Sequence, residues 1–460
     1  MSSPPMKDLM DTRMLCPLCG ISTLESDDME PAQLSRTAKI RQLASEDSEA
    51  AVAKLTAFLH DIFDIEIIEL QINNDQYSLN SLNGFFQSNG NAYFFKFHQE
   101  EGEEDMQGEY YRAEIVADAG LPIDMPIMMS TQPGEQILVY TKREDKRFSD
   151  VLLMLDKNPD DVAELRAADA EKVLNQQILA VALRTLHPVT RQQVVEEPMH
   201  HLFFDRMVNL KTGQAPGGRY KDFYIDKEFE FPGVKLSWDE FSNASLVING
   251  QRMQSTFGEI FEAAVQRLNP VNLADAGGFT AHGDAHNANV WYETNSSTPT
   301  LSYFDPAFAG KHIPSLLAEA KATFHNVFAH PLWLYDSNDA ATNFQTKAKY
   351  RNGNLFLDSD WELSRVRERL LEAKIEGFWQ PFLKELDARE MLPATWQQTL
   401  RSALAMCPAL VMNLRGGADR HNPDSSAIAF AMVGLCGSAP DGGSNLITDF
   451  FDRIDPSRIQ

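Results

Sequence analysis

The chain has 460 residues, enough to bury a large core and to form two or three lobes or domains. Its 66 acidic and 41 basic residues give a formal net charge of −25, which disfavours nucleic acid and membrane partners, because both need a basic face. No apolar run reaches the roughly 20 residues that a membrane span needs, and we expect no signal peptide. Four cysteines do not suggest a disulfide framework, so we expect a cytoplasmic location.

The N-terminal stretch, residues 1–47, is polar and rich in Ser, Asp, Glu and Pro, which predicts a loosely ordered arm. Cys16 and Cys19 within it, in Cys-Pro-Leu-Cys-Gly, resemble half of a zinc ribbon, and zinc normally needs four ligands. The other two cysteines, Cys407 and Cys436, lie far away in apolar helical contexts. The sequence therefore favours a free thiol pair over a completed metal site.

The next segment combines one helix with strand-like runs. Apolar residues at helical spacing predict a helix over 48–60. Residues 65–70 and the aromatic run 92–97 predict strands. Between them, 80–86 contains Asn and the single glycine Gly84, which predicts a loop between two strands.

The following elements indicate a boundary between two lobes. Residues 108–116 predict a helix, and 136–140 predict a short apolar strand. The charged run 142–145 follows that strand, so we place the boundary near 140–145. A long helix is expected over 161–187, apolar around much of its second half and ended by Pro188.

A region of mixed composition, 189–253, comes next. It contains several glycines and aromatic strand-like runs, and Asn249-Gly250 between short apolar runs predicts a tight hairpin. Helical patterns dominate the rest of the chain and cover 313–329, 361–387 with Asp360 as a possible cap, 394–414 and 424–436. We therefore expect the C-terminal part to be mainly helical.

One short segment carries most of the chemical information. Residues 282–289 read His-Gly-Asp-Ala-His-Asn-Ala-Asn, and Asp305 follows an apolar strand-like run. Phosphoryl transfer from a nucleoside triphosphate uses a carboxylate that takes up the acceptor proton, and an amide and a second carboxylate that hold the metal. Asp284, Asn289 and Asp305 supply these groups. The alternative interpretation is a solvated loop followed by an ordinary strand end.

These residues resemble the aminoglycoside phosphotransferase and choline kinase group, the small-molecule branch of the protein-kinase-like fold. The catalytic loop of that family reads His-Gly-Asp-x-His-x-x-Asn, and its metal-binding Asp is commonly followed by Pro. This sequence fills each fixed position, and Pro306 follows Asp305. The ending Leu183-Arg184-Thr185-Leu186-His187 also resembles the close of the family's central helix.

The resemblance implies roles for residues in both lobes. Asp284 would be the catalytic base, with His282 and His286 beside it, and Asn289 and Asp305 would bind Mg²⁺. The nucleotide, ATP or GTP, would be held by Lys96, Glu109 (or Glu114 as the fallback partner of Lys96), Gly84 in the phosphate loop, and the strand residues Val139 and Tyr140 near the adenine. Lys96 could instead be an edge-strand lysine that extends to water.

The resemblance also implies an architecture. We expect a bilobal, protein-kinase-like α+β fold, with a small antiparallel-sheet N-lobe over 48–142 and a larger helical C-lobe over 143–460. The region 189–253 would be the substrate-binding insertion, although it could equally be a lid or a dimer surface. The remaining histidines His312, His325 and His330 are expected to be ordinary helix and loop residues, and no zinc is expected.

The predicted activity is transfer of the γ-phosphoryl group to a hydroxyl of a small molecule. Aminoglycoside, choline-like, sugar, amino-alcohol and nucleoside acceptors all occur in the family, and the acidic balance of the chain favours a cationic, amine-bearing acceptor. Two alternatives stay open, a nucleotide-binding pseudokinase with a regulatory role and a protein kinase. The intact Asp284, Asn289 and Asp305 argue against the first, and the His-Gly-Asp and Asp-Pro forms argue against the second.

Overall fold

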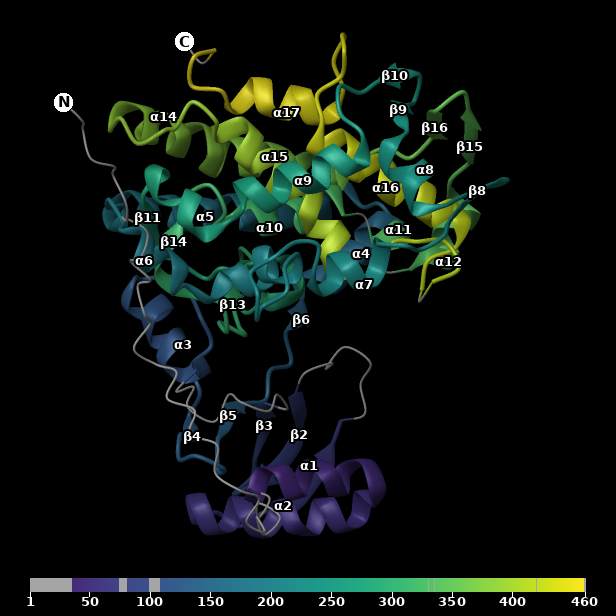
Figure 1. Ribbon diagram of the computed structural model, residues 1–460. Helices are drawn as coiled ribbons and strands as arrows, with labels where there is room; N and C mark the ends of the chain where they lie inside the picture. Colours follow the sequence, from purple (N-terminus) through teal and green to yellow (C-terminus); the bar gives the residue numbers. More distant parts are fainter. Residues whose placement is uncertain are drawn as a thin grey trace, which may run out of the picture.

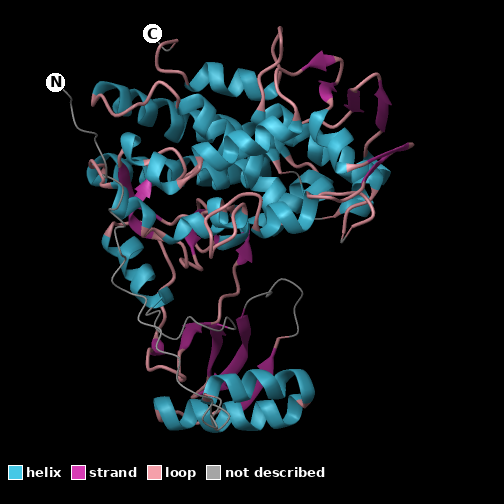
Figure 2. Ribbon diagram, viewed as in Figure 1, coloured by secondary structure: helices cyan, strands magenta, loops and turns pink. Residues whose placement is uncertain are grey.

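The computed structural model describes residues 35–73, 81–98, 108–329, 331–334, 336–418 and 420–458. It has two lobes, a small one built from a sheet and two helices and a larger one that is mostly helical (Figures 1 and 2). The predicted two-lobed α+β architecture is therefore confirmed. Cys16 and Cys19 lie outside the described residues, while Cys407 and Cys436 are buried in the large lobe as free thiols.

The small lobe is an antiparallel five-stranded sheet with the order β1-β2-β3-β5-β4. Its strands are β1(Glu69–Ile72), β2(Ser81–Ser88), β3(Asn91–His98), β4(Met128–Ser130) and β5(Ile137–Thr141). A tight turn at Asn89-Gly90 joins β2 to β3, and both turn residues have positive φ. This chemistry is typical of a two-residue hairpin, and it fixes the β2–β3 register that sets Lys96 opposite Asn83. In the pairing of β3 with β5, Lys96 lies opposite Leu138.

The two faces of this sheet differ in what covers them. Phe95 and Val139 are directly paired and fully buried against the helices α1(Arg36–Glu46) and α2(Ser48–Phe63), which lie beneath the sheet in Figure 1. Because side chains alternate along a strand, Lys96 and its partner Leu138 lie on the opposite face, toward the large lobe.

Helix α1 corrects the predicted extent of the N-terminal arm. Residues 36–46 were expected to be loosely ordered, but they form a helix that packs against α2. Ser35 caps this helix by accepting a hydrogen bond from the amide of Ala38, and Ile40 is buried in the small-lobe core. A single apolar anchor among polar residues gives a weak periodic signal, which explains why the sequence pattern missed the helix.

Two segments join the lobes, α3(Gly108–Asp118) and residues 142–145 between β5 and β6(Lys146–Arg147). Arg143 in the second segment forms ion pairs with Asp124 at 2.9 Å and Asp145 at 3.0 Å, and also with Glu293 of the large lobe. The indole nitrogen of Trp291 donates to the other oxygen of Asp124 at 2.8 Å. This network holds the connection in one arrangement.

The large lobe surrounds the 25-residue helix α5, which Asp160 caps by accepting from the amide of Ala163. Its helices are α4(Phe148–Lys157), α5(Asp161–Thr185), α6(Arg191–Val195), α7(Gly218–Tyr224), α8(Trp238–Asn243), α9(Phe257–Arg267), α10(Ala320–Thr323), α11(Pro331–Leu334), α12(Ser337–Asn343), α13(Arg365–Lys374), α14(Gln380–Ala388), α15(Trp396–Val411), α16(Pro423–Gly437) and α17(Leu446–Ile454).

Short helical turns and small sheets complete the lobe. The turns are η1(Pro198–Leu202), η2(Phe204–Arg206), η3(Pro270–Asn272), η4(Ala274–Ala276) and η5(Asn287–Asn289), with the π-helical turns η6(Phe324–Phe328) and η7(Ile375–Trp379). The strands are β7(Phe229–Phe231), β8(Val234–Leu236), β9(Ser245–Ile248), β10(Gln251–Arg252), β11(Gly278–Ala281), β12(Val290–Glu293), β13(Thr300–Tyr303), β14(Gly310–Pro314), β15(Thr346–Arg351) and β16(Asn354–Ser359).

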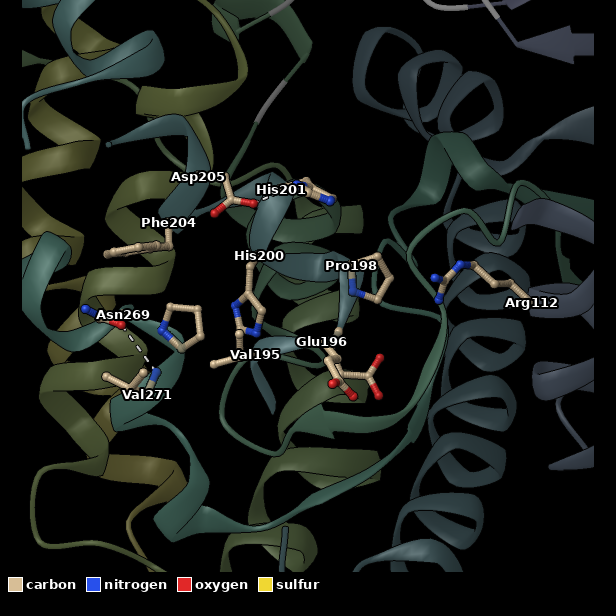
Figure 3. Close-up of a pocket in the computed structure, with 12 residues that line it drawn as sticks. Arg112, Val195, Glu196, Pro198, His200, His201, Phe204, Asp205, Asn269 and Val271 are labelled. Atoms are coloured by element: carbon tan, nitrogen blue, oxygen red, sulfur yellow. Dashed lines mark hydrogen bonds and ion pairs between the residues drawn. The ribbon is translucent and has the colours of Figure 1, made fainter. Parts of the chain in front are cut away.

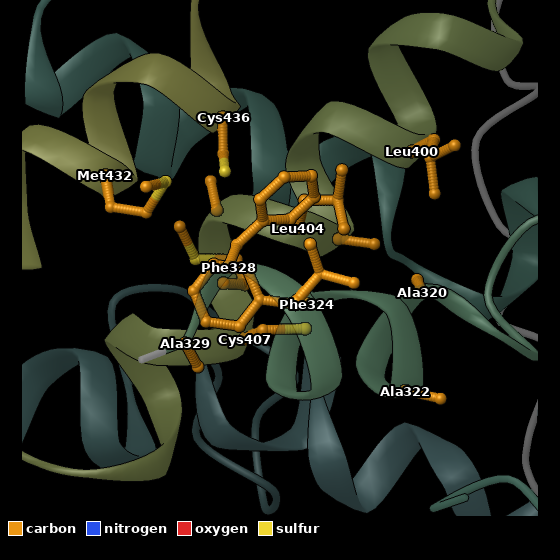
Figure 4. Packing of buried hydrophobic residues seen from close by; sticks show 14 of the residues in the cluster. Ala320, Ala322, Phe324, Phe328, Ala329, Leu400, Leu404, Cys407, Met432 and Cys436 are labelled. Atoms are coloured by element: carbon orange, nitrogen blue, oxygen red, sulfur yellow. The ribbon is translucent and has the colours of Figure 1, made fainter. Parts of the chain in front are cut away.

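The core of the large lobe lies where η6 meets α15. Phe324 and Phe328 of η6 belong to the same buried cluster as Leu404 and Cys407 of α15 (Figure 4). This packing fixes α10, which directly precedes η6, against α15. Among the described helices, none has an apolar stretch of the length that crosses a membrane.

The hairpin predicted at Asn249-Gly250 is present as β9 and β10, but it does not lie where we expected it. Strand β9 pairs in parallel with β16, and Gln251 of β10 bonds to the segment 442–445. Figure 1 places this sheet at the end of the large lobe away from the small lobe. The hairpin therefore does not cover the Asp284 loop, and another part of the insertion must approach that loop.

Candidate active site

The 282–289 loop connects β11 to β12, and one glycine determines its shape. Gly283 has φ +78°, a left-handed conformation that most residues avoid. A Cβ atom there would lie 2.1 Å from the carbonyl oxygen of Phe308. Only glycine therefore permits the turn that places His282 and Asp284 on either side of it.

His282 supports the backbone of this loop. One ring nitrogen, Nδ1, accepts from the amide of Asp284 at 3.3 Å, and the other, Nε2, lies 3.0 Å from the carbonyl oxygen of Phe304. The ring is buried, and burial lowers the pKa of His282. Both nitrogens thus meet backbone groups, and His282 tethers the loop to Phe304, the residue before Asp305, which favours support of the loop backbone over a direct part in the reaction.

Asp284 is only 7% exposed, and its main partner is a lysine that the sequence interpretation missed. Nζ of Lys321, on α10, lies 2.5 Å from Oδ1 of Asp284. Burial alone would raise the pKa of Asp284, but the charges of Lys321 and His286 hold it well below its usual range. Asp284 is therefore ionised at neutral pH, as an acceptor of a hydroxyl proton must be.

His286 lies beside the same carboxylate. Its Nδ1 accepts from the amide of Ala288 at 3.3 Å, so the other nitrogen carries the proton and faces Asp284 Oδ1 at 3.6 Å. Burial lowers the pKa of His286 to about 4, so the ring is neutral near pH 7. The ring of His325, a residue of the helical turn η6, lies 5.4 Å from that of His286.

Asp305, Asn289 and Lys96 come together where the two lobes meet. Nζ of Lys96 lies 2.7 Å from Oδ1 of Asp305, across 209 residues of sequence. The amide nitrogen of Asn289 donates to the backbone carbonyl of Asp284 at 3.0 Å, which leaves its amide oxygen for another ligand. Asp305 has φ +57°, a conformation that Asp tolerates better than most residues.

These oxygens fit magnesium. One carboxylate and one amide oxygen are hard ligands of the kind that Mg²⁺ takes from proteins, with water and phosphate completing the shell. In the parts of the chain that the structure describes, no three His, Cys, Asp or Glu side chains gather as a metal site. A zinc-type cage is thus not formed there, whereas a magnesium site needs only the Asp305 and Asn289 pair.

The remaining predicted nucleotide residues need correction. Gly84 lies inside strand β2, opposite Ile72 and Phe95, instead of in a phosphate loop. A Cβ atom there would lie 2.0 Å from the carbonyl oxygen of Gln71 on β1 and 2.8 Å from the Phe95 ring on β3, so this glycine makes room for both neighbouring strands. The connection from β1 to β2 that could cover phosphates, residues 74–80, falls outside the described residues.

Val139 and Glu109 were also expected at the nucleotide. The carbonyl of Val139 accepts from the amide of Ile127 at 2.8 Å, and its side chain is buried in the small-lobe core, which weighs against a contact between Val139 and a nucleotide. Tyr140, one residue on, lies on the opposite face, paired with Phe94. Glu109 is the second residue of α3 and its side chain is outside the described part, so its pairing with Lys96, with Glu114 as the fallback, stays a prediction. Among the described side chains, Asp305 pairs with Lys96.

Two arginines of the insertion approach the same loop. Arg206 of η2 and Arg219 of α7 both donate to the carbonyl of Leu410 at the end of α15, at 3.3 and 2.8 Å. Burial and the charge of Arg219 lower the pKa of Arg206 to about 10, while the charge of Asp284 acts in the opposite direction. Arg206 is therefore close enough to Asp284 for their charges to interact, and the residues 204–219 form the part of the insertion near the site.

A separate pocket of about 370 Å³ lies between α3, the segment 195–205 and the segment 269–271. Figure 3 shows Arg112, His200, His201 and Asp205 among its lining residues. Nδ1 of His201 and Oδ2 of Asp205 lie 2.6 Å apart. None of the predicted site residues lines this pocket, so it is distinct from the Asp284 site, although Asp205 directly precedes Arg206.

Comparisons with known proteins give limited similarity. No family model matches the sequence, and no curated protein matches it. Among solved structures, a spectinomycin phosphotransferase bound to ADP and spectinomycin is similar, with 12% identity, a TM-score of 0.37, and coverage of 83% of this chain and 98% of that chain.

Two further solved structures are similar to a comparable extent. A thermostable aminoglycoside phosphotransferase mutant bound to AMP-PNP and hygromycin B has 11% identity and a TM-score of 0.41, covering 83% of this chain and 98% of that chain. A microcompartment-associated aminopropanol kinase has 10% identity and a TM-score of 0.39, covering 84% of this chain and 95% of that chain. A TM-score below 0.5 does not establish a function, so the functional argument rests on the residues of the site.

Proposed function

We propose that this protein is a phosphotransferase that moves the γ-phosphoryl group of ATP or GTP to a hydroxyl of a small molecule. One observation supports it above the others: a buried, ionised Asp284 shares a loop with Asn289, while Asp305 forms an ion pair with Lys96 from the other lobe. A base, two metal ligands and a phosphate-binding cation are the groups that such a transfer uses.

In this proposal, the two lobes divide the work. The small lobe, which includes α1 and extends to β5, holds the nucleotide through Lys96 and through the sheet face that carries Leu138 and Tyr140. The large lobe supplies Asp284 and the acceptor side. Asp305 and Asn289 would hold magnesium, which would neutralise phosphate charge when bound. When the nucleotide phosphates arrive, they compete with Asp305 for the ammonium group of Lys96.

Asp284 orients the acceptor hydroxyl and takes up its proton. Because phosphoryl transfer proceeds through a loose transition state, positioning and charge stabilisation contribute more than proton removal. A carboxylate with a low pKa is therefore adequate for this role. His286, which is neutral and presents an N–H toward Asp284, can donate a hydrogen bond to the carboxylate or to the acceptor.

The acceptor is a free small molecule in this proposal. The overall acidic charge favoured an amine-bearing acceptor, such as an aminoglycoside or a choline-like alcohol. Lys321, the ion-pair partner of Asp284, is instead a cation, while His286 beside it is neutral, and a cation at this point weighs against an amine. The charges near the reacting atoms matter more than the charge of the whole surface, because the latter is screened over about 8 Å at physiological salt.

A nucleotide-consumption screen tests the proposal. The full chain is incubated with ATP or GTP and magnesium, together with a panel of hydroxylated metabolites and antibiotics. We expect at least one acceptor to stimulate formation of the nucleoside diphosphate in the parent protein and not in Asp284→Asn. Nucleotide binding without turnover on any acceptor would instead indicate a pseudokinase, and phosphate found only on protein would indicate a protein kinase.

A further inference from the structure

The surroundings of Asp284 hold more positive charge than the carboxylate needs. Lys321 contacts Asp284 directly at 2.5 Å, and Arg206 and Arg219 lie together at the end of α15, the helix against which α10 with Lys321 packs. His286 and His325 add no charge at neutral pH, because burial lowers the pKa of each ring. Lys321 thus pairs with the carboxylate while two further cations lie at the end of the neighbouring helix, in a chain whose net charge is −25.

The two arginines are only partly used by the fold. Each donates through Nη1 to the carbonyl of Leu410, and Arg219 donates to Val411 as well, which satisfies the C-terminal end of α15. Helix capping therefore accounts for one nitrogen of each guanidinium group. Neither arginine forms an ion pair with a carboxylate among the residues that the structure describes.

The position of these cations is fixed by well-packed elements. Residues 204–219 fold back on themselves, with the amide of Gly217 donating to the carbonyl of Met207 at 2.8 Å. Lys321 lies on α10, and α10 packs against α15. The next residue after α10 is Phe324, which is buried in the core shown in Figure 4. Like charges that are held together in a partly buried place raise the free energy of the protein unless an anion joins them.

From this arrangement we propose that the acceptor is an anionic hydroxyl compound, whose carboxylate or phosphate is bound by Arg206 and Arg219 with the help of Lys321. The inference rests on the proposed phosphotransferase function and names its substrate class. Arginine guanidinium groups suit an anionic acceptor, because their paired N–H donors match the oxygens of carboxylates and phosphates.

The anionic group also gives Lys321 a role in the reaction. When it binds, it competes with Asp284 for the Lys321 ammonium, so Asp284 becomes available to the acceptor hydroxyl. The hydroxyl O–H bond then breaks and its proton passes to Asp284. The acceptor oxygen bonds to the γ-phosphorus, and the bond from that phosphorus to the β–γ bridging oxygen breaks, so the nucleoside diphosphate leaves with the electron pair.

The test compares acceptors by charge and then removes the arginines. Hydroxylated compounds are grouped as anionic, neutral and cationic, and the kcat/KM of each is measured with the full chain. We expect the best acceptors to carry a carboxylate or a phosphate, and comparing those two kinds identifies the anion. Best acceptors that are neutral or cationic would overturn the proposal, and turnover on none would overturn the phosphotransferase function itself.

Arg206→Gln and Arg219→Gln should each raise the KM for the anionic acceptor at least tenfold, while the KM for the nucleotide changes less than twofold. Lys221→Gln, an exposed charge change on the same helix α7, is the matched control and should change neither constant. An equal rise in both constants, or a rise for the nucleotide alone, would assign the arginines to the γ-phosphate and overturn the proposal.

A binding measurement gives a readout that does not need turnover. Sulfate, compared with chloride at equal ionic strength, should raise the melting temperature of the parent protein and of Lys221→Gln, and less so that of the Arg206→Gln/Arg219→Gln double variant. Arg206→Lys, which keeps the charge, should recover part of the sulfate effect if the double variant folds poorly. An equal sulfate effect in all variants would contradict an anion site at these arginines.

Discussion

Two buried lysines, Lys321 and Lys374, stand in opposite situations although both face carboxylates in the large lobe. Nζ of Lys374 lies 3.0 Å from Glu319, 3.5 Å from Glu171 and 2.5 Å from the Asn175 amide oxygen. Two acids and an amide thus surround one lysine. Lys321, only two residues after Glu319, pairs with the single carboxylate of Asp284, and Arg206 and Arg219 lie without a carboxylate partner among the described residues at the end of the neighbouring helix α15.

The different surroundings of the two lysines distinguish a structural ion-pair network around Lys374 from a binding site around Lys321. Burial would lower the pKa of Lys374, but Glu319 and Glu171 raise it above its ordinary value, so its ammonium stays charged. Burial raises the pKa of Glu319, and the charge of Lys374 lowers it only in part, because that lysine also faces Glu171. This network is complete without a ligand. In our proposal, the Lys321 cluster, which comprises Lys321, Arg206, Arg219 and Asp284, has the reverse imbalance, and an anionic acceptor completes it.

The largest effect is expected on the free energy of unfolding when each of the two lysines is replaced. Lys374→Met should lower the free energy of unfolding by about 3–5 kcal/mol, because it leaves two buried glutamates without their cation. Lys321→Met should lower it less, since Arg206 remains near Asp284, yet it should impair turnover. Urea unfolding of both variants measures this, and equal losses would mean that Lys321 is also a structural residue.

A second variant addresses the base at the centre of the Lys321 cluster. Asp284→Asn should reduce kcat on the order of 10²-fold or more, because an amide cannot take up the hydroxyl proton. Nucleotide affinity should be retained, since Asp284 does not contact the Lys96 and Asp305 pair in the proposed scheme. Turnover equal to that of the parent would show that Asp284 is not the base.

A third variant tests the metal side of the site. Asp305→Ala should abolish the magnesium dependence of nucleotide binding, because it removes the carboxylate that would hold the metal. It also releases Lys96 from its ion pair, so weak metal-independent binding should persist. Calorimetry of ATP binding with and without magnesium provides the measurement. If magnesium still strengthens binding to the variant as it does in the parent, Asp305 is merely a strand-end acid.

The smallest effect is expected at the N-terminus. Removing residues 1–34 should leave stability and activity nearly unchanged, because that stretch has too few apolar residues to form a core of its own. Removing 1–47 should lower the melting temperature, because α1 is lost and Ile40 leaves the small-lobe core. Thermal melts of the two truncations decide this, and equal melting temperatures would show that α1 adds nothing.

The sequence was most informative where function depends on neighbouring residues. The 282–289 loop could be found because its groups are close in sequence, and the Asn249-Gly250 hairpin could be found because its turn needs positive φ. Periodicity predicted α2, α5, α15 and α16 within a few residues. The order of strands and helices, together with the family resemblance, was enough to predict two lobes.

Residues that tertiary packing brings together were beyond such local patterns. Lys321 occurs in an alanine-rich helical run, where nothing local points toward Asp284, 37 positions earlier in the printed sequence. The predicted helix 313–329 is instead the end of strand β14 followed by α10, which carries Lys321, and η6. A charged residue in a largely apolar run was the available signal, as for Lys96, but Glu319 two residues before Lys321 weakens it.

Glycine was ambiguous for a physical reason. Gly283 is required by a left-handed turn, whereas Gly84 is required by the ring of Phe95 across a strand. A left-handed turn and a crowded strand position both select glycine, so the sequence alone does not tell the two cases apart. The Asn and Gly around 80–84 therefore predicted a loop where the structure has strand β2. Sequence periodicity cannot separate these cases, because the second depends on a neighbour that arrives from another strand.

The most direct measurement of the central claim is phosphorus NMR of the product formed by the full chain with ATP, magnesium and the best acceptor of the screen. We expect a new phosphomonoester signal on a small molecule that carries a carboxylate or a second phosphate, and none with Asp284→Asn. A monoester on a neutral or cationic molecule would contradict the anionic acceptor, and phosphate appearing only on protein would contradict the account of this site.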